Sequence, residues 1–382
     1  MGTEIKRNLA SIQRIEEVRD IENADAIQAY RVLGWWVVDK KDAHKVGDLV
    51  VYLSLDCWVP HELAPFLSKG SVPREYNGVK GERLKTIRLR GQVSQGLLIK
   101  PEFHELFDAL SIVGLAREDG TQPGRVGVGE GSDVTDLFGI QKWEAPIPAQ
   151  LQGQAAGMFP TSLIPKTDQE RIQNCFGEIQ KKAKRFATEK VWNAETQTLE
   201  EHPVVLPEDF QEPTYEVTMK LDGSSCTIFR WEGELRVASR NLELKINDEN
   251  KDNTFVNKAL EIGNYIPDGF AFQGEIVGPN IQGNREGFSH HLFFVFDIFD
   301  IRKHEYLKPS DRRAMTDRIG LGHVPILGTD WTAPNSVEEG LALAEGPSIN
   351  HKVREGLVWK CNEDPSFSFK TISNQYLLAG GE

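Results

Sequence analysis

The stretch MKLDGSSCTIFR, residues 219–230, places a lysine where a buried strand would normally carry an apolar residue. Lys220 stands between Met219 and Leu221, and it is followed by Asp222 and a glycine. A lysine in such a context is either paired or used in chemistry, because burial of an unpaired ammonium is costly. The same letters also fit a surface β-hairpin with an Asp-Gly turn and a solvated Lys and Asp. On this stretch alone, both interpretations stay open.

Later stretches supply further side chains that chemistry could use. They are Arg240 in ASRN, Glu275 in FQGE, Phe296 and Asp297 in FFVFDIF, Glu355 in EGLVWK and Lys370 in SFKTIS. Each one alone has a structural explanation, such as a paired surface carboxylate, a core aromatic ring or a solvated lysine. Their occurrence together, in this order, is much harder to explain by structure alone.

The bulk composition describes an ordinary globular protein. The chain has 382 residues, of which 39% are hydrophobic and 26% charged, and this length suits two domains. No apolar run approaches a membrane span, and the mixed, charged N-terminus is unlike a signal peptide. Four scattered cysteines without a C-x-x-C pair fit neither a zinc site nor a disulfide framework. We therefore expect a cytoplasmic protein, or a nuclear one in a eukaryote, that is not secreted.

The net charge of -13 argues against a protein that coats nucleic acid non-specifically, although an acidic body can carry a basic groove. The segment RLKTIRLR, residues 83–90, alternates charged with apolar residues and predicts a strand with one cationic face. Its cations are Arg83, Lys85, Arg88 and Arg90. A second basic run, over residues 181–190, is more typical of a solvated helix face.

The elements that must position these residues fall into two regions. Residues 1 to about 105 contain short β-rich runs split by Gly, Asp and Pro, which predict a small closed barrel such as an OB-fold. Trp35 and Trp36 are expected to pack in that barrel more than to stack on bases. Residues 106 to about 155 indicate a loose connection.

A helix is predicted next. In the segment that starts at Pro165, Thr167 or Asp168 can cap a helix whose apolar residues recur on one face. From about residue 213 to the end, β-rich runs return with few helices between them.

The ordered series Lys-x-Asp-Gly, Arg, Glu, Phe-Asp, Glu-Gly, Lys resembles the covalent nucleotidyltransferase superfamily of ligases and mRNA capping enzymes. KLDGSS is similar to motif I, FQGE to motif III, FFVFDIF to motif IIIa, EGLVWK to motif IV and SFKTIS to motif V. Ahead of them, GWWVVDKKDAHKVGDLVVYLSLDCWVP, RLKTIRLRGQVSQGLL and FPTSLIPKTDQERIQN resemble ATP-dependent RNA ligases with an N-terminal OB-fold domain. With these segments, the resemblance spans nearly the whole chain.

The resemblance implies an α+β fold. An N-terminal OB-like β-barrel would be followed by a nucleotidyltransferase (ATP-grasp-like ligase) domain built on antiparallel sheets. Residues 1–140 would form an OB-fold RNA-binding domain with its linker, and residues 141–382 the adenylyltransferase catalytic domain. We expect a monomer that does not act at a membrane.

The implied activity is joining of 5′-phosphate and 3′-hydroxyl RNA ends, free or in a nicked duplex, for RNA repair or nick sealing. ATP would donate AMP through a covalent lysyl-AMP and an RNA-adenylate, with Mg²⁺ or Mn²⁺ as the metal. Lysine suits the first step because its amine forms a stable yet transferable phosphoramidate. We expect burial and a nearby cation to lower the pKa of Lys220 from about 10.4 toward neutrality.

The catalytic and nucleotide-binding roles follow residue by residue from the resemblance. Lys220 would be the nucleophile, and Lys370 would bind the α-phosphate as the second catalytic group. Glu275 would accept a hydrogen bond from the ribose. Phe296 would stack on adenine, and Phe294, on the same side of the strand, is the alternative. Arg240 would contact the ribose or the RNA 3′ end, and Lys166 would contact the phosphates.

The metal and RNA contacts are implied in the same way. Asp222 and Glu355 would hold metal-bound water. RNA would be contacted by Arg83, Lys85, Arg88, Arg90, Arg171, Ser224 and Ser225. Ser368 stands where many superfamily members carry the first lysine of a Lys-x-Lys in motif V, which leaves open whether another cation shares the role of Lys370.

Three alternatives stay open. A DNA ligase or a capping guanylyltransferase of the same superfamily carries a similar motif I, but the chain ends 12 residues after Lys370, too soon for their C-terminal OB domain. A nucleic-acid-binding relative with a dead ligase domain is the third, and the intact set of motif residues argues against it.

Overall fold

The computed structural model describes residues 8–55, 57–99, 129–143, 153–185, 188–193, 198–203 and 206–380, with backbone only over 188–193 and 198–203. The chain divides into two compact units, which consist mainly of Thr3–Pro146 and Ile147–Gly381. Each unit is described by itself. Most of the predicted loose connection, residues 106–128 and 144–152, lies outside the described residues.

The N-terminal unit is built from short antiparallel strands. One sheet joins β1 (Ala10–Arg14), β5 (Leu49–Leu53) and β11 (Leu97–Ile99). A second joins β2 (Glu17–Asp20), β3 (Ile27–Val32) and β4 (Trp35–Lys40). A third joins β12 (Gln141–Lys142), β6 (Cys57–Pro60), β8 (Val79–Arg83) and β7 (Arg74–Tyr76), and β9 (Ile87–Leu89) pairs with β10 (Gln92–Ser94).

The two adjacent tryptophans of this unit have different environments. Trp35 is 1% exposed within an apolar cluster of the barrel, as alternation along β4 requires. Trp36 points the other way and lies under the guanidinium of Arg19, whose Cζ is 4.3 Å from the ring centroid. Of the two tryptophans, only Trp35 is therefore a core residue.

The prediction of one strand over residues 83–90 is wrong. The chain bends between the end of β8 and the start of β9, where Leu84 turns into the apolar core at 6% exposure while Ile87 stays 48% exposed. Arg90 and Gly91 then form the tight turn to β10, with φ of 47° and 86°. The cations of this segment therefore do not share a single strand face.

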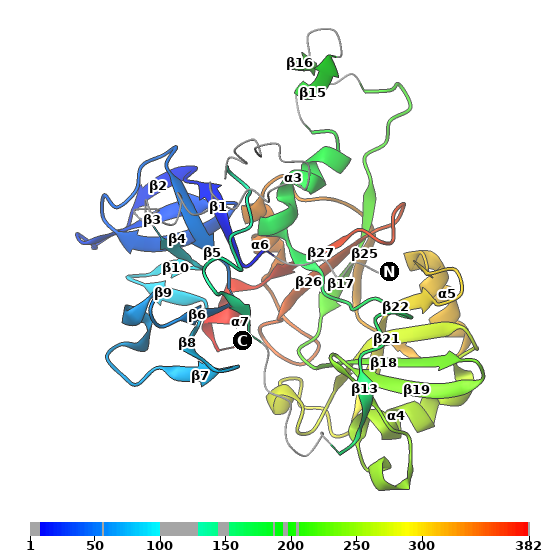
Figure 1. Ribbon diagram of the computed structural model, residues 1–382. Helices are drawn as coiled ribbons and strands as arrows, with labels where there is room; N and C mark the ends of the chain where they lie inside the picture. The colour runs from blue at the N-terminus through cyan, green and yellow to red at the C-terminus, as the bar shows by residue number, and fades with distance from the viewer. Residues whose placement is uncertain are drawn as a thin grey trace, which may run out of the picture. The chain divides into compact units, whose positions relative to one another are not determined.

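The C-terminal unit holds two larger sheets (Figure 1). The eight-stranded sheet runs β13 (Ala155–Met158), β20 (Leu242–Leu244), β19 (Glu234–Ser239), β18 (Ser224–Trp231), β21 (Phe270–Val277), β22 (Leu292–Asp300) and β23 (Glu305–Tyr306), with β24 (Gly322–His323) also on β22. The five-stranded sheet runs β14 (Glu170–Arg171), β27 (Ser368–Ile372), β26 (Gly356–Cys361), β17 (Thr214–Lys220) and β25 (Ile326–Thr332). A separate hairpin joins β15 (Thr188–Asn193) to β16 (Thr198–Pro203).

Helices cover these sheets. They are α3 (Ile172–Lys182), α4 (Thr254–Ile262), α5 (Pro309–Arg318), α6 (Val337–Ala344) and α7 (Asn374–Leu378). In Figure 1, α4 lies against the eight-stranded sheet, and α3 and α6 lie beside the five-stranded one. The predicted helix is confirmed as α3, with Ile172 and Ile179 fully buried. Its predicted cap is wrong, because residues 170–171 pair with β27 as a strand and the helix begins only at Ile172.

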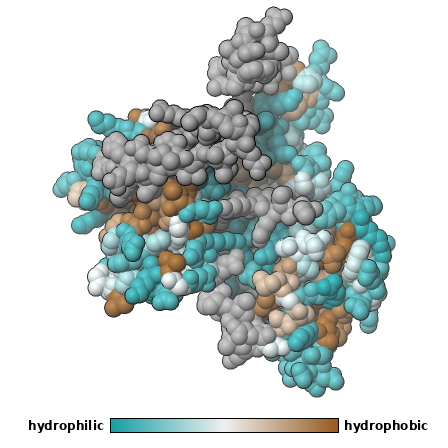
Figure 2. All heavy atoms as spheres, in the orientation of Figure 1, coloured by the Kyte–Doolittle hydropathy of each residue, from teal (hydrophilic) through white to brown (hydrophobic). Residues whose placement is uncertain are grey.

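The outer surface is largely polar. Figure 2 shows hydrophilic residues predominating on the visible described surface. Large exposed apolar side chains, such as Val72 at 87% and Met158 at 68%, are scattered over both units. In the part of the chain that the structure describes, no helix has the length and apolar character needed to cross a membrane.

Candidate active site

Lys220 occupies the last position of β17, where the chain leaves the five-stranded sheet for β18 of the eight-stranded sheet. Its strand partner is Gly356, the first residue of β26, so the preceding Glu355 lies next to it. Lys220 Nζ is 2.6 Å from Glu355 Oε1, and the two side chains are 27% and 14% exposed. The lysine of the opening stretch is therefore an ion-paired group at the junction of two sheets, and not a solvated hairpin residue.

Asp222 lies in the turn between β17 and β18, because β17 ends at Lys220 and does not continue through it. Gly223 is needed in this turn: a Cβ there would lie 2.4 Å from the Ile276 carbonyl oxygen of β21. The backbone of β21 thus approaches the turn closely, and it brings Glu275 to the same place.

Three strands of the eight-stranded sheet align the predicted nucleotide contacts. Ser225 of β18 pairs with Glu275 of β21, and Glu275 pairs with Phe294 of β22. Phe294 and Phe296 are both half-buried and pack against an apolar cluster that contains Leu221. Both rings therefore stay candidates for the adenine stack.

Acidic side chains are grouped around Lys220. Burial raises the pKa of Glu275 to about 8, and the Glu355 and Asp222 carboxylates add to this while Lys220 opposes it. Burial, followed by the Glu355 charge, also raises the pKa of Asp222. Three acidic side chains thus surround one lysine in a poorly hydrated space, and burial opposes ionisation of two of them, Glu275 and Asp222.

The expected lowering of the Lys220 pKa is wrong for this structure. Burial does lower the pKa of Lys220, but the Glu355, Glu275 and Asp222 carboxylates together raise it above its ordinary value. The side chain is therefore an ammonium, and it must lose its proton before it can act as a nucleophile.

Lys370 lies on β27 in the five-stranded sheet. It pairs with Val358 of β26 on one side and with Arg171 of β14 on the other. Arg171 is buried, at 6% exposure, whereas Lys370 is half-buried. Ser368 lies opposite Lys360, whose ammonium is held by Asp297 and by the Phe296 carbonyl oxygen at 2.9 Å.

Two further predicted contacts are brought together at the turn between β19 and β20, and the charge of Arg240 opposes the rise that burial causes in the pKa of Glu275. Arg240 follows β19, is 58% exposed and lies 2.8 Å from Asp168. Lys166 donates to the amide oxygen of Asn241 at 3.3 Å. The segment 166–168 therefore lies along the turn that carries Arg240.

Sequence reasoning missed Arg285 and Tyr376. The Arg285 Nε atom lies 3.8 Å from Asp222 Oδ2, and its Cζ is 4.7 Å from the centroid of the Tyr376 ring. The Tyr376 hydroxyl donates a hydrogen bond to the Asp222 carboxylate. Arg285 lies in a Gly- and Asn-rich loop and Tyr376 in a five-residue helix, so no spacing pattern marks either one.

The carboxylates of the site bear on how a metal could be held. Among the described residues, no three His, Cys, Asp or Glu side chains are grouped closely enough to hold an ion. Asp222 and Glu355 nevertheless fit a divalent cation held through water, because carboxylate oxygens suit the water shell that such an ion retains.

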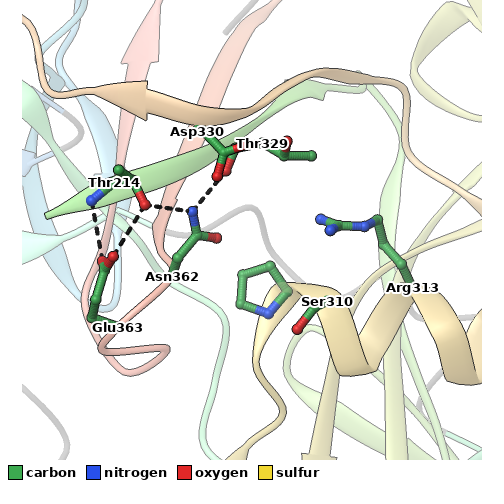
Figure 3. A pocket seen from close by; sticks show the side chains of 8 residues that line it. Thr214, Ser310, Arg313, Thr329, Asp330, Asn362 and Glu363 are labelled. Carbon is green, nitrogen blue, oxygen red and sulfur yellow. Dashed lines mark hydrogen bonds between the residues drawn. The ribbon is translucent and has the colours of Figure 1, made fainter.

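A different hollow, of about 320 Å³, lies at the opposite end of β17 (Figure 3). Its walls come from the starts of β17 and α5, from β25 and from the turn after β26. The lining residues, all outside the predicted set, are Thr214, Pro309, Ser310, Arg313, Thr329, Asp330, Asn362 and Glu363. Its polar groups largely bind one another, as Figure 3 shows for Thr214, Asn362 and Glu363.

In the N-terminal unit, the predicted RNA contacts differ in exposure. The guanidinium of Arg83 is stacked on Trp143, with Cζ 4.0 Å from the ring centroid. Lys85, Arg88 and Arg90 are exposed, the last two beside the turn of the β9–β10 hairpin.

Comparison with known proteins identifies the class. Residues 213–372 match the family model described as RNA ligase, and residues 9–101 match that of an OB-fold domain. No curated protein matches the chain.

Solved structures extend the match to nearly the whole chain. Naegleria gruberi RNA ligase, as a Lys-to-Ala variant with ATP and Mn, shares 37% identity over 97% of this chain and 98% of that chain, with a TM-score of 0.76. A Lys-to-Met variant with AMP and Mn gives the same values. The enzyme with PPi shares 36% identity over 97% and 98% of the two chains, with a TM-score of 0.72. The chain belongs to the RNA ligase family, and the predicted α+β fold, an OB-fold followed by a ligase domain on antiparallel sheets, is confirmed.

Proposed function

We propose that this RNA ligase uses ATP and Mg²⁺ or Mn²⁺ to join 5′-phosphate and 3′-hydroxyl RNA ends. The observation that carries the proposal is the junction of the two sheets, where Lys220 lies among Glu355, Glu275 and Asp222. The Naegleria enzyme binds ATP, AMP and PPi in its solved structures, and these are the substrate and the products of adenylyl transfer. Nick sealing or repair is the role that this chemistry serves.

Lys220 is the nucleophile of the first step. The ammonium separates from Glu355 and releases a proton to water, and the amine then attacks the α-phosphorus of ATP. A P–N bond forms, the P–O bond to the β-phosphate breaks, and pyrophosphate leaves. In the second step an oxygen of the RNA 5′-phosphate attacks the same phosphorus and the P–N bond breaks. In the third step the 3′-hydroxyl attacks the activated 5′-phosphate, and AMP leaves.

The neighbours of Lys220 hold the nucleotide. Glu275 accepts from a ribose hydroxyl, and Phe296, or Phe294 beside Glu275, stacks on adenine. Lys370 contacts the α-phosphate and offsets its developing charge, which in phosphoryl transfer is a large part of catalysis. The remaining proposed contacts are Arg240 at the ribose or the RNA 3′ end and Lys166 at the phosphates.

Asp222 and Glu355 serve the metal. A divalent ion bound here supplies charge stabilisation at phosphate oxygens. The two carboxylates of this chain orient the water around that ion, because Mg²⁺ retains several of its waters when bound.

Both units contact the RNA substrate in this proposal. We assign residues 1–140 to an RNA-binding OB-fold domain with its linker, and residues 141–382 to the catalytic domain; the enzyme acts as a monomer. Exposed cations on a β hairpin suit phosphate contacts. The proposed RNA contacts are Arg83, Lys85, Arg88 and Arg90 in the first domain and Ser224 and Ser225 in the second. Arg171, the remaining residue of the predicted set, is 6% exposed and is not kept as a direct contact.

The test is radiolabel transfer followed by sealing. Labelled ATP, and not GTP, is expected to label the purified chain, and the labelled chain is expected to seal a 5′-phosphate RNA to an RNA 3′-hydroxyl better than to an all-DNA end. Transfer from GTP would indicate a capping guanylyltransferase, and equal sealing of all-DNA nicks a DNA ligase. A chain that takes no label from either nucleotide would refute the proposed function.

A further inference from the structure

Asp222 is contacted by two side chains from distant parts of the sequence. Arg285 approaches one carboxylate oxygen at 3.8 Å, and the Tyr376 hydroxyl donates a hydrogen bond to the same carboxylate. Arg285 also lies over the Tyr376 ring at 4.7 Å. The turn that carries Asp222 belongs to neither sheet. No strand pairing therefore fixes the Asp222 side chain, and the contacts with Arg285 and Tyr376 do.

Tyr376 is itself firmly anchored. Ser373 caps α7 by accepting from the Tyr376 amide at 3.0 Å, and its hydroxyl donates to Glu345 at 2.7 Å. The Ser373 amide donates to the Glu355 carbonyl oxygen at 2.9 Å. The helix α7 is thus fixed to the backbone of Glu355, and its Tyr376 hydroxyl bonds the side chain of Asp222.

The hydroxyl of Tyr376 is not needed for packing. The ring is 3% exposed and packs with Ile372, Leu377 and Val353, which a phenylalanine would do equally well. A buried hydroxyl costs free energy unless it finds a partner, and this one finds a carboxylate. Removal of the Tyr376 hydroxyl therefore distinguishes a role at Asp222 from a role in core packing.

We propose that Tyr376 is a positioning residue which, together with Arg285, orients Asp222 toward the water shell of the divalent metal. The inference rests on the proposed function, because it assumes that Asp222 serves the metal. Tyr376 touches neither ATP nor RNA in this account and acts only through Asp222.

Removal of the hydroxyl is expected to weaken use of the metal without slowing the chemistry. In Tyr376→Phe the ring still packs against Arg285, but the Asp222 carboxylate loses a donor. We expect the Mn²⁺ concentration for half-maximal adenylation to rise about tenfold, or ~1.4 kcal/mol, as for loss of a hydrogen bond to a charged group. The rate at saturating Mn²⁺ is expected to stay within about twofold of wild type.

The experiment compares the full-length wild type, Tyr376→Phe and Tyr215→Phe. Tyr215 is a matched control, since its ring is buried in the same unit and its hydroxyl has no hydrogen-bond partner among the described residues. AMP-adduct formation is followed against Mn²⁺ concentration. Binding of Mn²⁺ with AMP present is measured separately from the electron paramagnetic resonance signal of the free ion, and thermal unfolding without metal reports stability.

A Mn²⁺ shift in both measurements for Tyr376→Phe, and none for Tyr215→Phe, supports the inference. An unchanged Mn²⁺ requirement overturns it. A rate that falls at every Mn²⁺ concentration, with a lower unfolding temperature and unchanged Mn²⁺ binding, overturns it as well, because it shows a structural role. A wild-type chain that forms no AMP adduct refutes the proposed function instead, so the two failures are distinguishable.

Discussion

Lys220 cannot attack phosphorus while it is bound to Glu355. Its amine is protonated and lies 2.6 Å from the carboxylate, and the surrounding carboxylates raise its pKa. The resting site therefore stores the nucleophile as an ion pair, and substrate and metal must change this charge balance before transfer begins.

Replacement of either metal carboxylate tests this balance at the scale of single residues. Asp222→Asn and Glu355→Gln are each expected to slow AMP-adduct formation on the order of 10- to 100-fold, as observed when residues that orient metal ligands are lost. Rates are measured by intact mass across a range of Mg²⁺ concentrations. Asp248→Asn, an exposed aspartate of the same unit, is the control. Near-normal rates for both variants at every Mg²⁺ concentration would exclude the metal role.

At the scale of elements, β17 is fixed by buried charges. Glu216 of this strand is 0% exposed and binds Arg312 and Arg313 of α5. Arg312 also donates through Nε to His323 Nε2 at 2.9 Å, and the His323 Nδ1 atom is 2.7 Å from the Val324 carbonyl oxygen. These contacts require a neutral imidazole with its proton on Nδ1, so the network that seats the Lys220 strand is sensitive to acid.

This sensitivity has a definite sign. Burial, followed by the charge of Arg312, lowers the pKa of His323 to about 4, from about 6.5 in an unfolded chain. Between these values the unfolded chain binds more protons, so stability is lost as the pH falls from about 6.5 to about 4, by at most about 3 kcal/mol. His323→Gln is expected to lose this part of the pH dependence. Denaturant unfolding at several pH values, with the exposed His290→Gln as control, measures it. Parallel stability curves for wild type and His323→Gln would contradict the argument.

The same scale separates what the sequence could predict from what it could not. The order of the motifs, through the resemblance to nucleotidyltransferases, was enough to predict that Lys220, Glu275 and Glu355 serve one site, and the registers of the two sheets bring them together. The positions of Arg285 and Tyr376 depend on a loop and a short helix that tertiary contacts place beside Asp222. Local periodicity carries no information about such contacts.

The errors have physical causes of the same kind. The break after Arg83 arises because Leu84 packs into the barrel, and the sequence marks it: the charged residues change from odd positions, 83 and 85, to even positions, 88 and 90. The pKa of Lys220 is raised because carboxylates from β21 and from the residue before β26 approach it. The apolar sequence around Lys220 indicated that the lysine is buried, but it did not indicate which carboxylates would lie beside it.

At the scale of the whole molecule, the two units are expected to divide the work between RNA positioning and adenylyl transfer. The exposed Arg88 and Arg90 lie in the N-terminal unit, whereas each proposed nucleotide contact lies in the other. Phosphate contacts of this kind depend on salt, because binding releases counterions. Loss of these contacts should therefore affect sealing and leave the reaction with ATP unchanged.

Joint replacement of Arg88 and Arg90 by Gln tests this division. Adenylation is expected to remain within about twofold of wild type, while the sealing of 5′-phosphate RNA falls several-fold and depends less steeply on salt. Lys45→Gln with Lys69→Gln, two exposed cations outside the β9–β10 hairpin, is the matched control. An equal loss of adenylation and sealing, or no loss of sealing, would show that these arginines do not position RNA.

The central claim is that Lys220 carries AMP between ATP and RNA, and the position of the adduct tests it most directly. The full chain is incubated with ATP and Mn²⁺, and the modified peptide is mapped by mass spectrometry. We predict a single AMP on Lys220, none in Lys220→Ala or Lys220→Arg, and a normal adduct in the exposed control Lys245→Ala. Adenylation of the Lys220→Ala chain, or an adduct mapped to another lysine of the wild type, would contradict the account.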